Sequence, residues 1–138
     1  MPTLESVIPR FRAADRDTRL ETLLDYARKL PALPERYEAE KALGTARVHE
    51  CQTPVFLWIE VSDGAVHIHA DVPRESPTVR GFVSLLVRTL DGRPPAEVAR
   101  VPNDLLDQLG LTEVLGMTRT QGLSAILGRL KRAVAAPP

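Results

Sequence analysis

Cys51 is the only cysteine among the 138 residues, and it lies between His49-Glu50 and an apolar run that begins after Pro54. A lone cysteine excludes an internal disulfide, and it cannot supply the several thiolates of a closed zinc or iron–sulfur site. The chemistry left to one thiol is nucleophilic attack or sulfur exchange with a partner. Its polar neighbours and Pro54 favour a loop that presents the sulfur. A buried cysteine acting as a small hydrophobic side chain remains the alternative.

Three histidines offer this thiol a partner. His67 and His69 share one face of a predicted strand, so together with His49 and Cys51 they have the residue types of a zinc site. Strand alternation alone also places both imidazoles on the solvent side of a half-buried hairpin, so we expect no metal. A hydrolase built on Cys51 and His49 is a further alternative. It lacks the signatures of known cysteine hydrolases and any evident third orienting group.

The totals exclude several classes of protein. The 18 basic and 18 acidic side chains cancel, so no overall field attracts nucleic acid or anionic lipid. No signal-peptide core is visible near the amino terminus, and no apolar run approaches the roughly 20 residues that span a bilayer. We expect a cytoplasmic protein that binds neither nucleic acid nor membrane, with one compact domain over residues 1–138.

The apolar spacing predicts helices joined by short, proline-rich connections. Asp17 is the expected N-cap of a helix that ends at Pro31, and Asn103 the expected N-cap of a short one. Pro94-Pro95 occupy a favoured helix start. The expected helices cover residues 17–30, 78–90, a short stretch from 94, 104–109, and a final one from 118 or 120 to 134.

A change to period two after Arg47 predicts a small sheet. Residues 55–61 and 65–70 read as strands joined by the two-residue turn Asp63-Gly64. Residues 47–51 are a candidate third strand that delivers Cys51 at its end. The sequence therefore predicts an α+β fold, a small three-stranded antiparallel sheet packed with helices.

Four segments, in order, resemble the SufE family of sulfur-acceptor proteins, and the likeness extends over essentially the whole chain. They are residues 26–34 (YARKLPALP), 48–55 (VHECQTPV), 78–82 (TVRGF) and 119–123 (RTQGL). The second is similar to the family's glycine-cysteine-glutamine-serine motif, and the last to its arginine-serine-glutamine-glycine-leucine motif. Glu50, Thr53 and Phe56 replace the family's usual glycine, serine and tryptophan.

The resemblance implies a SufE/IscU-like fold and a sulfur carrier. Cys51 would accept persulfide sulfur from a SufS-type cysteine desulfurase and pass it to a SufBCD-type scaffold for iron–sulfur cluster assembly. Glu50, Gln52 and Thr53 would shape its loop, and Arg119 would hold that loop or meet the partner. Such a protein stimulates the desulfurase rather than acting as an enzyme itself, and it needs no cofactor, because the pyridoxal phosphate belongs to the desulfurase.

Two expectations about geometry follow. Cys51 should lie on a loop at the edge of the sheet with its sulfur partly shielded by apolar side chains. Arg119 should lie near that loop, bonded to Glu50 or to a loop carbonyl, since an arginine at a helix start has no favourable dipole interaction. The alternative function is a non-catalytic regulatory or redox-sensing binding protein whose cysteine is structural.

Overall fold

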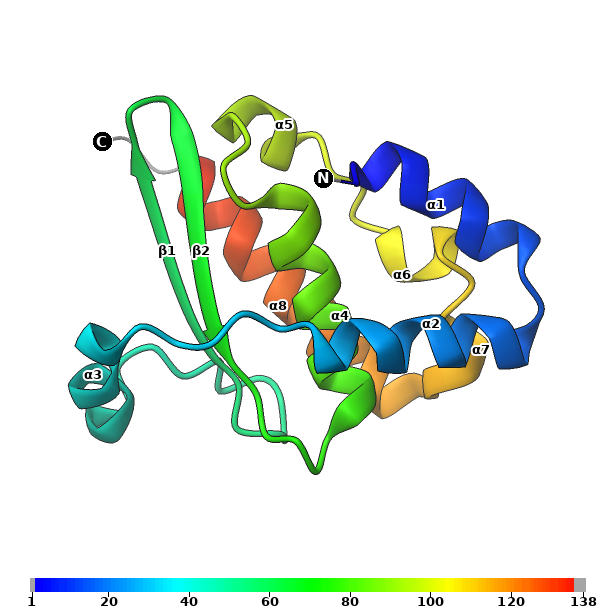
Figure 1. Cartoon of the computed structure of the whole chain (residues 1–138), viewed down its shortest axis with the longest axis horizontal. Coiled ribbons are helices and arrows are strands. Elements are labelled where there is room, and N and C mark those ends of the chain that lie inside the picture. The colour runs from blue at the N-terminus through cyan, green and yellow to red at the C-terminus, as the bar shows by residue number, and fades with distance from the viewer. Residues whose placement is uncertain (1, 136–138) are drawn as a thin grey trace.

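The computed structural model describes residues 2–135, and the remaining residues of the predicted 1–138 domain lie outside that range. Helices surround a two-stranded hairpin (Figure 1). In chain order the elements are α1 (Leu4–Ala13), α2 (Arg16–Arg28), η1 (Glu35–Tyr37), α3 (Glu38–Leu43), β1 (Phe56–Ser62), β2 (Ala65–Asp71), α4 (Pro77–Leu90), α5 (Pro95–Ala99), α6 (Leu105–Gln108), α7 (Thr112–Leu115) and α8 (Met117–Ala135).

The predicted hairpin is confirmed. β1 and β2 pair antiparallel, and Asp63 and Gly64 both have positive φ, at 52° and 75°. Two consecutive positive-φ residues suit the right-handed twist of the flanking strands, and Asp-Gly tolerates that conformation at low cost.

The predicted third strand is wrong in extent, since between residues 2 and 135 the sheet has two strands. Only an isolated bridge joins Arg47 to Phe56. The N–H of Val48 donates to the carbonyl of Val55 at 2.9 Å, and the N–H of Cys51 turns back to the carbonyl of Val48 at 3.3 Å. The chain therefore leaves the sheet after Val48.

Several helix boundaries differ from the predicted ones. Asp15, not Asp17, is the N-cap of α2, since its carboxylate accepts the Thr18 N–H at 2.8 Å. Asp104 rather than Asn103 precedes α6, and α8 begins at Met117. Helices α1 and α7 were not predicted, and residues 31–43, whose prolines and charges indicate a loop with room for one helical turn, contain both η1 and α3. Helices α4 and α5 begin within one residue of the expected positions.

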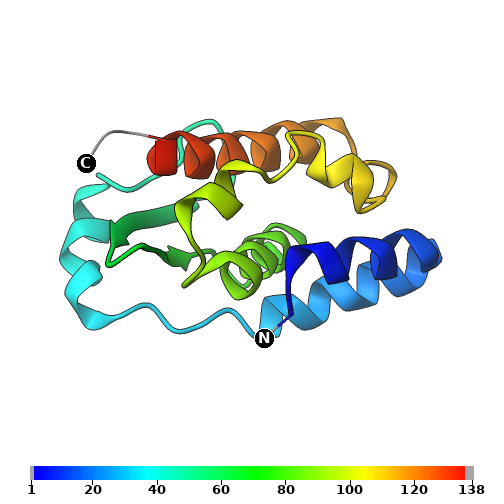
Figure 2. The ribbon, with the colours of Figure 1, turned by 90° about the horizontal axis from the view of Figure 1, so that it is seen from above.

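Helix α4 is the centre of the core. Ten of its 14 residues are buried, so it needs apolar neighbours on nearly every side. Figure 2 shows α4 beside the hairpin in a middle layer, with α8 on one side and α2 on the other. Val66, Ile68 and Ala70 of β2 face this core, as the alternation predicts.

The contact between α2 and α4 is unusually close. A Cβ built on Gly81 would lie 2.2 Å from the carbonyl oxygen of Leu23, so only glycine fits there. Two arginines of α4 bind the end of α2. Arg80 donates to the carbonyls of Ala27 at 2.8 Å and Val72 at 2.6 Å. Arg88 donates to the carbonyl of Lys29 at 2.8 Å.

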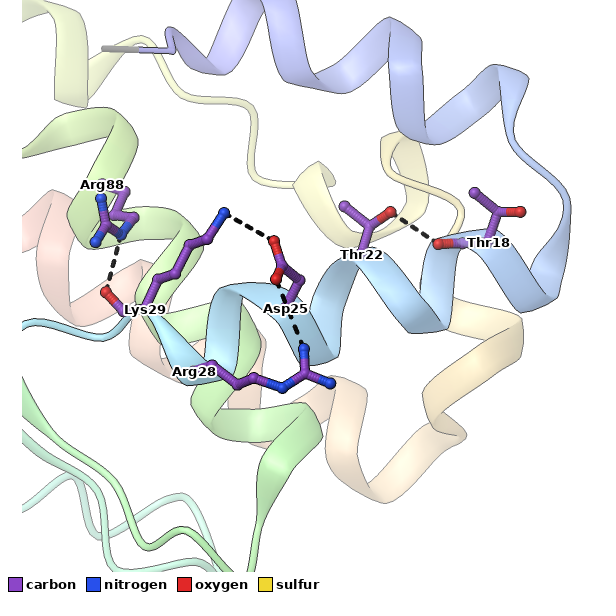
Figure 3. A network of polar contacts seen from close by, with 6 residues as sticks. All are labelled: Thr18, Thr22, Asp25, Arg28, Lys29 and Arg88. Atoms are coloured by element: carbon purple, nitrogen blue, oxygen red, sulfur yellow. Dashed lines mark hydrogen bonds and ion pairs between the residues drawn. The ribbon is translucent and has the colours of Figure 1, made fainter.

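Figure 3 shows the Arg88 bond beside the surface ion pairs of α2. The Asp25 carboxylate forms ion pairs with the ammonium of Lys29 at 2.8 Å and with the guanidinium of Arg28 at 3.6 Å. All three side chains are about half exposed or more. Such exposed pairs contribute little to stability, so the backbone carbonyl contacts and the apolar packing determine how α2 lies on α4. None of the helices in residues 2–135 combines the length and the apolar composition that a membrane span needs.

Candidate functional site

The Cys51 loop, residues 49–54, leaves the sheet at Val48 and returns at Val55. Both valines are fully buried and joined by a backbone hydrogen bond, so the two ends of the loop are fixed in the core. His49, Glu50 and Gln52 are exposed, as expected of a loop without sheet partners. Cys51 therefore lies on a loop that is anchored at both ends and free of regular structure between them.

The sulfur of this loop points inward. Cys51 is 6% exposed and belongs to the main apolar cluster of the protein. It lies close to Gly122 of α8, since a Cβ built there would be 3.2 Å from the Cys51 Sγ. The prediction of a shielded sulfur on a loop beside the sheet is confirmed, and the shielding is nearly complete.

Cys51 also lines a cavity of about 430 Å³. Three segments that are distant in sequence form its walls: the Cys51 loop, the first turn of α4 with the two residues before it, and the first turns of α8. Thr53 Oγ1 donates to Ser76 Oγ at 3.5 Å, a contact that links the loop to the start of α4. A volume of this size is in the range of binding pockets, far above that of a trapped water.

All five residues predicted for the site lie in the walls of this cavity. The structure thus brings together Glu50, Cys51, Gln52, Thr53 and Arg119, the last from a segment almost 70 residues away. Their roles in sulfur transfer stay predictions, because proximity alone assigns no function.

The expected hydrogen bond of Arg119 is absent. Arg119 is exposed in the first turn of α8, and within residues 2–135 its side chain makes no hydrogen bond or ion pair, with Glu50 or with a loop carbonyl. Its predicted location beside the Cys51 loop is correct, but its predicted partner is wrong. The guanidinium is therefore left available at the wall of the cavity.

His49 lies in the Cys51 loop but is not among the residues that line the cavity, and His67 and His69 lie on β2, away from it. His67 and His69 pair with Glu60 and Trp58 across the hairpin, and the His69 ring lies 5.0 Å from the Tyr37 ring. Tyr37 also stacks on Trp58 at 5.0 Å, so the segment before α3 covers this face of the sheet. The described residues contain no group of three His, Cys, Asp or Glu side chains that could hold a metal ion.

Sequence reasoning missed Gly122 and Glu75 as parts of the site. The signal for Gly122 was present, because an isolated glycine inside a helical pattern usually has a packing reason. Glu75, in the connection between β2 and α4, had no comparable signal. With Glu50 it gives the cavity two carboxylates beside the single guanidinium of Arg119.

Comparisons with known proteins agree on one family. The SufE family model, described as an Fe-S metabolism associated domain, matches residues 5–134. An uncharacterized SufE-like protein of Mycobacterium tuberculosis is 41% identical over 130 residues, covering 94% of this chain and 89% of that protein. The sulfur acceptor protein CsdE of Escherichia coli is 31% identical over 112 residues, covering 80% and 72% respectively. The solution structure of a hypothetical protein from Thermus thermophilus matches with a TM-score of 0.82 at 37% identity, covering 96% of this chain and 93% of that one.

Proposed function

The chain belongs to the SufE family of Fe-S metabolism, and from that premise we propose that it is a sulfur carrier whose Cys51 accepts persulfide sulfur from a cysteine desulfurase. The observation that carries the proposal is the position of the only thiol. Cys51 lies in the wall of a cavity of about 430 Å³, and the walls come from the two segments that resemble the family's cysteine and arginine motifs and from the start of α4.

The proposed transfer is a thiol exchange. Cys51 loses its proton to solvent, and the thiolate attacks the outer sulfur of a persulfide on the partner's cysteine. The sulfur–sulfur bond of the partner breaks, a new one forms on Cys51, and the electron pair leaves with the partner's thiolate. No oxidant, reductant or cofactor of this chain enters the step, and the desulfurase supplies the pyridoxal phosphate.

A buried Cys51 suits a sulfur carrier only if the loop that holds it can move. An exposed persulfide would lose its sulfur to small thiols, whereas Cys51, a residue only 6% exposed, is screened from them. Attack on a partner's persulfide requires the same sulfur to emerge. The loop is anchored at Val48 and Val55, and the backbone hydrogen bonds of Cys51 and Thr53 are to those two residues, so the loop is the segment that can move.

The partners proposed are a SufS-type cysteine desulfurase as donor and a SufBCD-type scaffold as recipient. In this scheme Glu50, Gln52 and Thr53 shape the loop around the sulfur, and the unpaired guanidinium of Arg119 meets the partner or the anionic sulfur. The protein then acts as an accessory that accelerates the desulfurase by removing its product.

Intact-mass spectrometry tests the proposal. The protein is incubated with a cysteine desulfurase, pyridoxal phosphate and cysteine, and we expect additions of about 32 Da per sulfur atom, which cyanide or a reducing thiol removes. Cys51→Ser is the matched control and should gain no mass. Adducts of equal yield on Cys51→Ser, or none on the native protein, would refute the assignment.

The burial of Cys51 also favours the alternative of a binding or regulatory protein with a structural cysteine. Such a protein would bind its partner equally well with Cys51→Ser and would gain no sulfur. The same mass measurement therefore separates the two functions.

A further inference from the structure

We propose that Gly122 is the positioning residue that holds the Cys51 sulfur in its buried place. The missing side chain at position 122 leaves room for the sulfur, and a Cβ there would press on Cys51, which would have to move by a few tenths of an ångström and would be less well held in its buried place. This deepens the proposed function, on which its biological meaning rests. The steric contact between a Cβ at position 122 and Cys51 does not depend on the function of the protein.

The contact involves Cys51 alone. A Cβ at Gly122 would lie 3.2 Å from Sγ, 3.5 Å from Cα and 3.6 Å from Cβ of Cys51, and these are its three nearest neighbours. Carbon atoms in contact are ordinarily about 3.5–4.0 Å apart, and sulfur is larger than carbon. An added methyl group would therefore overlap the sulfur, and the overlap would fall on no other residue.

The loop, rather than the helix, must yield. Leu123 and Ile126 of α8 are fully buried, and α8 packs against α5, α7 and β1. The Cys51 loop has backbone ties at its ends, exposed residues between them and the cavity beside it. A side chain at position 122 would consequently shift the loop from the buried toward the exposed arrangement.

A persulfide on Cys51 needs space beside its sulfur. The outer sulfur would lie about 2.0 Å beyond Sγ, the length of a sulfur–sulfur bond. The cavity that Cys51 and Gly122 both line provides such space. Gly122 thus helps to set how deeply the thiol is held, next to the space that a second sulfur requires.

Alkylation of Cys51 by iodoacetamide in the protein alone tests this inference. Gly122→Ala should react about fivefold faster or more, because the overlap disfavours the buried arrangement. Gly128→Ala is the matched control on the same helix, since a Cβ there would meet only the guanidinium of Arg132. It should react at the native rate. A native rate for Gly122→Ala would overturn the proposal.

A second control separates positioning from general loss of stability. Leu130 is fully buried in α8, so Leu130→Ala should lower the melting temperature without changing the alkylation rate well below it. If Leu130→Ala accelerates alkylation as much as Gly122→Ala does, Gly122 has no special role and the proposal fails.

A double-mutant cycle covers the case in which Gly122→Ala folds poorly. Cys51→Ala removes the sulfur that the new methyl group would meet, so Gly122→Ala should lower the melting temperature less in that background than in the native one. An equal loss in both backgrounds would overturn the proposal.

None of these assays uses a desulfurase. Faster alkylation of Gly122→Ala, with no sulfur adduct in the separate mass measurement, would keep Gly122 as the positioning residue and refute the sulfur carrier. A native alkylation rate for Gly122→Ala, with a sulfur adduct on Cys51, would refute the positioning role and keep the sulfur carrier.

Discussion

Replacing Gly81 with alanine should be among the most damaging single-methyl changes in this protein. Gly81 lies where α4 crosses α2, and a Cβ there would be 2.2 Å from the carbonyl oxygen of Leu23 and 2.9 Å from its Cγ. Even close carbon–oxygen contacts are about 3.3 Å. The two helices would have to separate by about 1 Å, since Leu23 and Phe82 are fully buried and backbone atoms cannot turn aside.

The magnitude follows from two opposing effects. Overpacking and the gaps opened around Leu23 and Phe82 cost about 4 kcal/mol, at the upper end for overfilled cores. Alanine gains about 1 kcal/mol over glycine inside a helix. The free energy of unfolding should fall by about 3 kcal/mol, which lowers the melting temperature of a protein of this size by about 10 °C.

Thermal and urea unfolding followed by circular dichroism measure this change. Gly128→Ala makes the same substitution in α8, where the new Cβ would meet only the flexible end of Arg132. It should raise the free energy of unfolding by up to about 1 kcal/mol. The reasoning is refuted if Gly81→Ala melts at or above the native temperature, because the helices would then tolerate a Cβ at their crossing.

Three further substitutions give distinct expectations. Cys51→Ser should abolish the sulfur adduct and lower the free energy of unfolding by about 1–2 kcal/mol, because a hydroxyl replaces a buried thiol; an unchanged urea midpoint would mean that the sulfur is solvated. Arg119→Ala should slow sulfur acceptance while changing stability by less than about 0.5 kcal/mol, since its side chain is exposed; native transfer kinetics would remove it from the site. Arg80→Met should cost about 3 kcal/mol by leaving the carbonyls of Ala27 and Val72 without their donor, and a native melting curve would contradict this.

Local patterns predicted the parts of the fold that local physics determines. The hairpin followed from period-two alternation around Asp63-Gly64, a pair that accepts positive φ, and α4 from its apolar spacing. Helix α1 was missed although Leu4, Val7 and Phe11 have helical spacing, because that segment was read only as a candidate signal peptide. Four-residue α7 is too short to give a periodic signal.

The prediction of a third strand was wrong, and the burial pattern shows why. Val48 and Cys51 are both buried and lie three residues apart, whereas a strand buries residues two apart. Pairing also depends on a partner elsewhere in the chain, which local alternation does not reveal. The five residues named for the site were found through their motifs and line one cavity, while their roles stay predictions. The sequence could not reveal that Arg119 lacks the expected hydrogen bond to Glu50 or to a loop carbonyl, because such a bond depends on side-chain distances.

A purely structural cysteine and a carrier cysteine share the burial seen at Cys51, so the surroundings of the sulfur must separate them. A structural cysteine is expected in contact on all sides, because unfilled space beside a core side chain costs stability. Cys51 instead lies beside Gly122, which has no side chain, and both residues line a cavity of about 430 Å³ whose other walls include Glu50, Gln52 and Arg119. A polar lining suits a space that holds solvent, and the volume of the cavity leaves room for a second sulfur. The combination of a buried thiol and an adjacent polar cavity therefore favours the carrier.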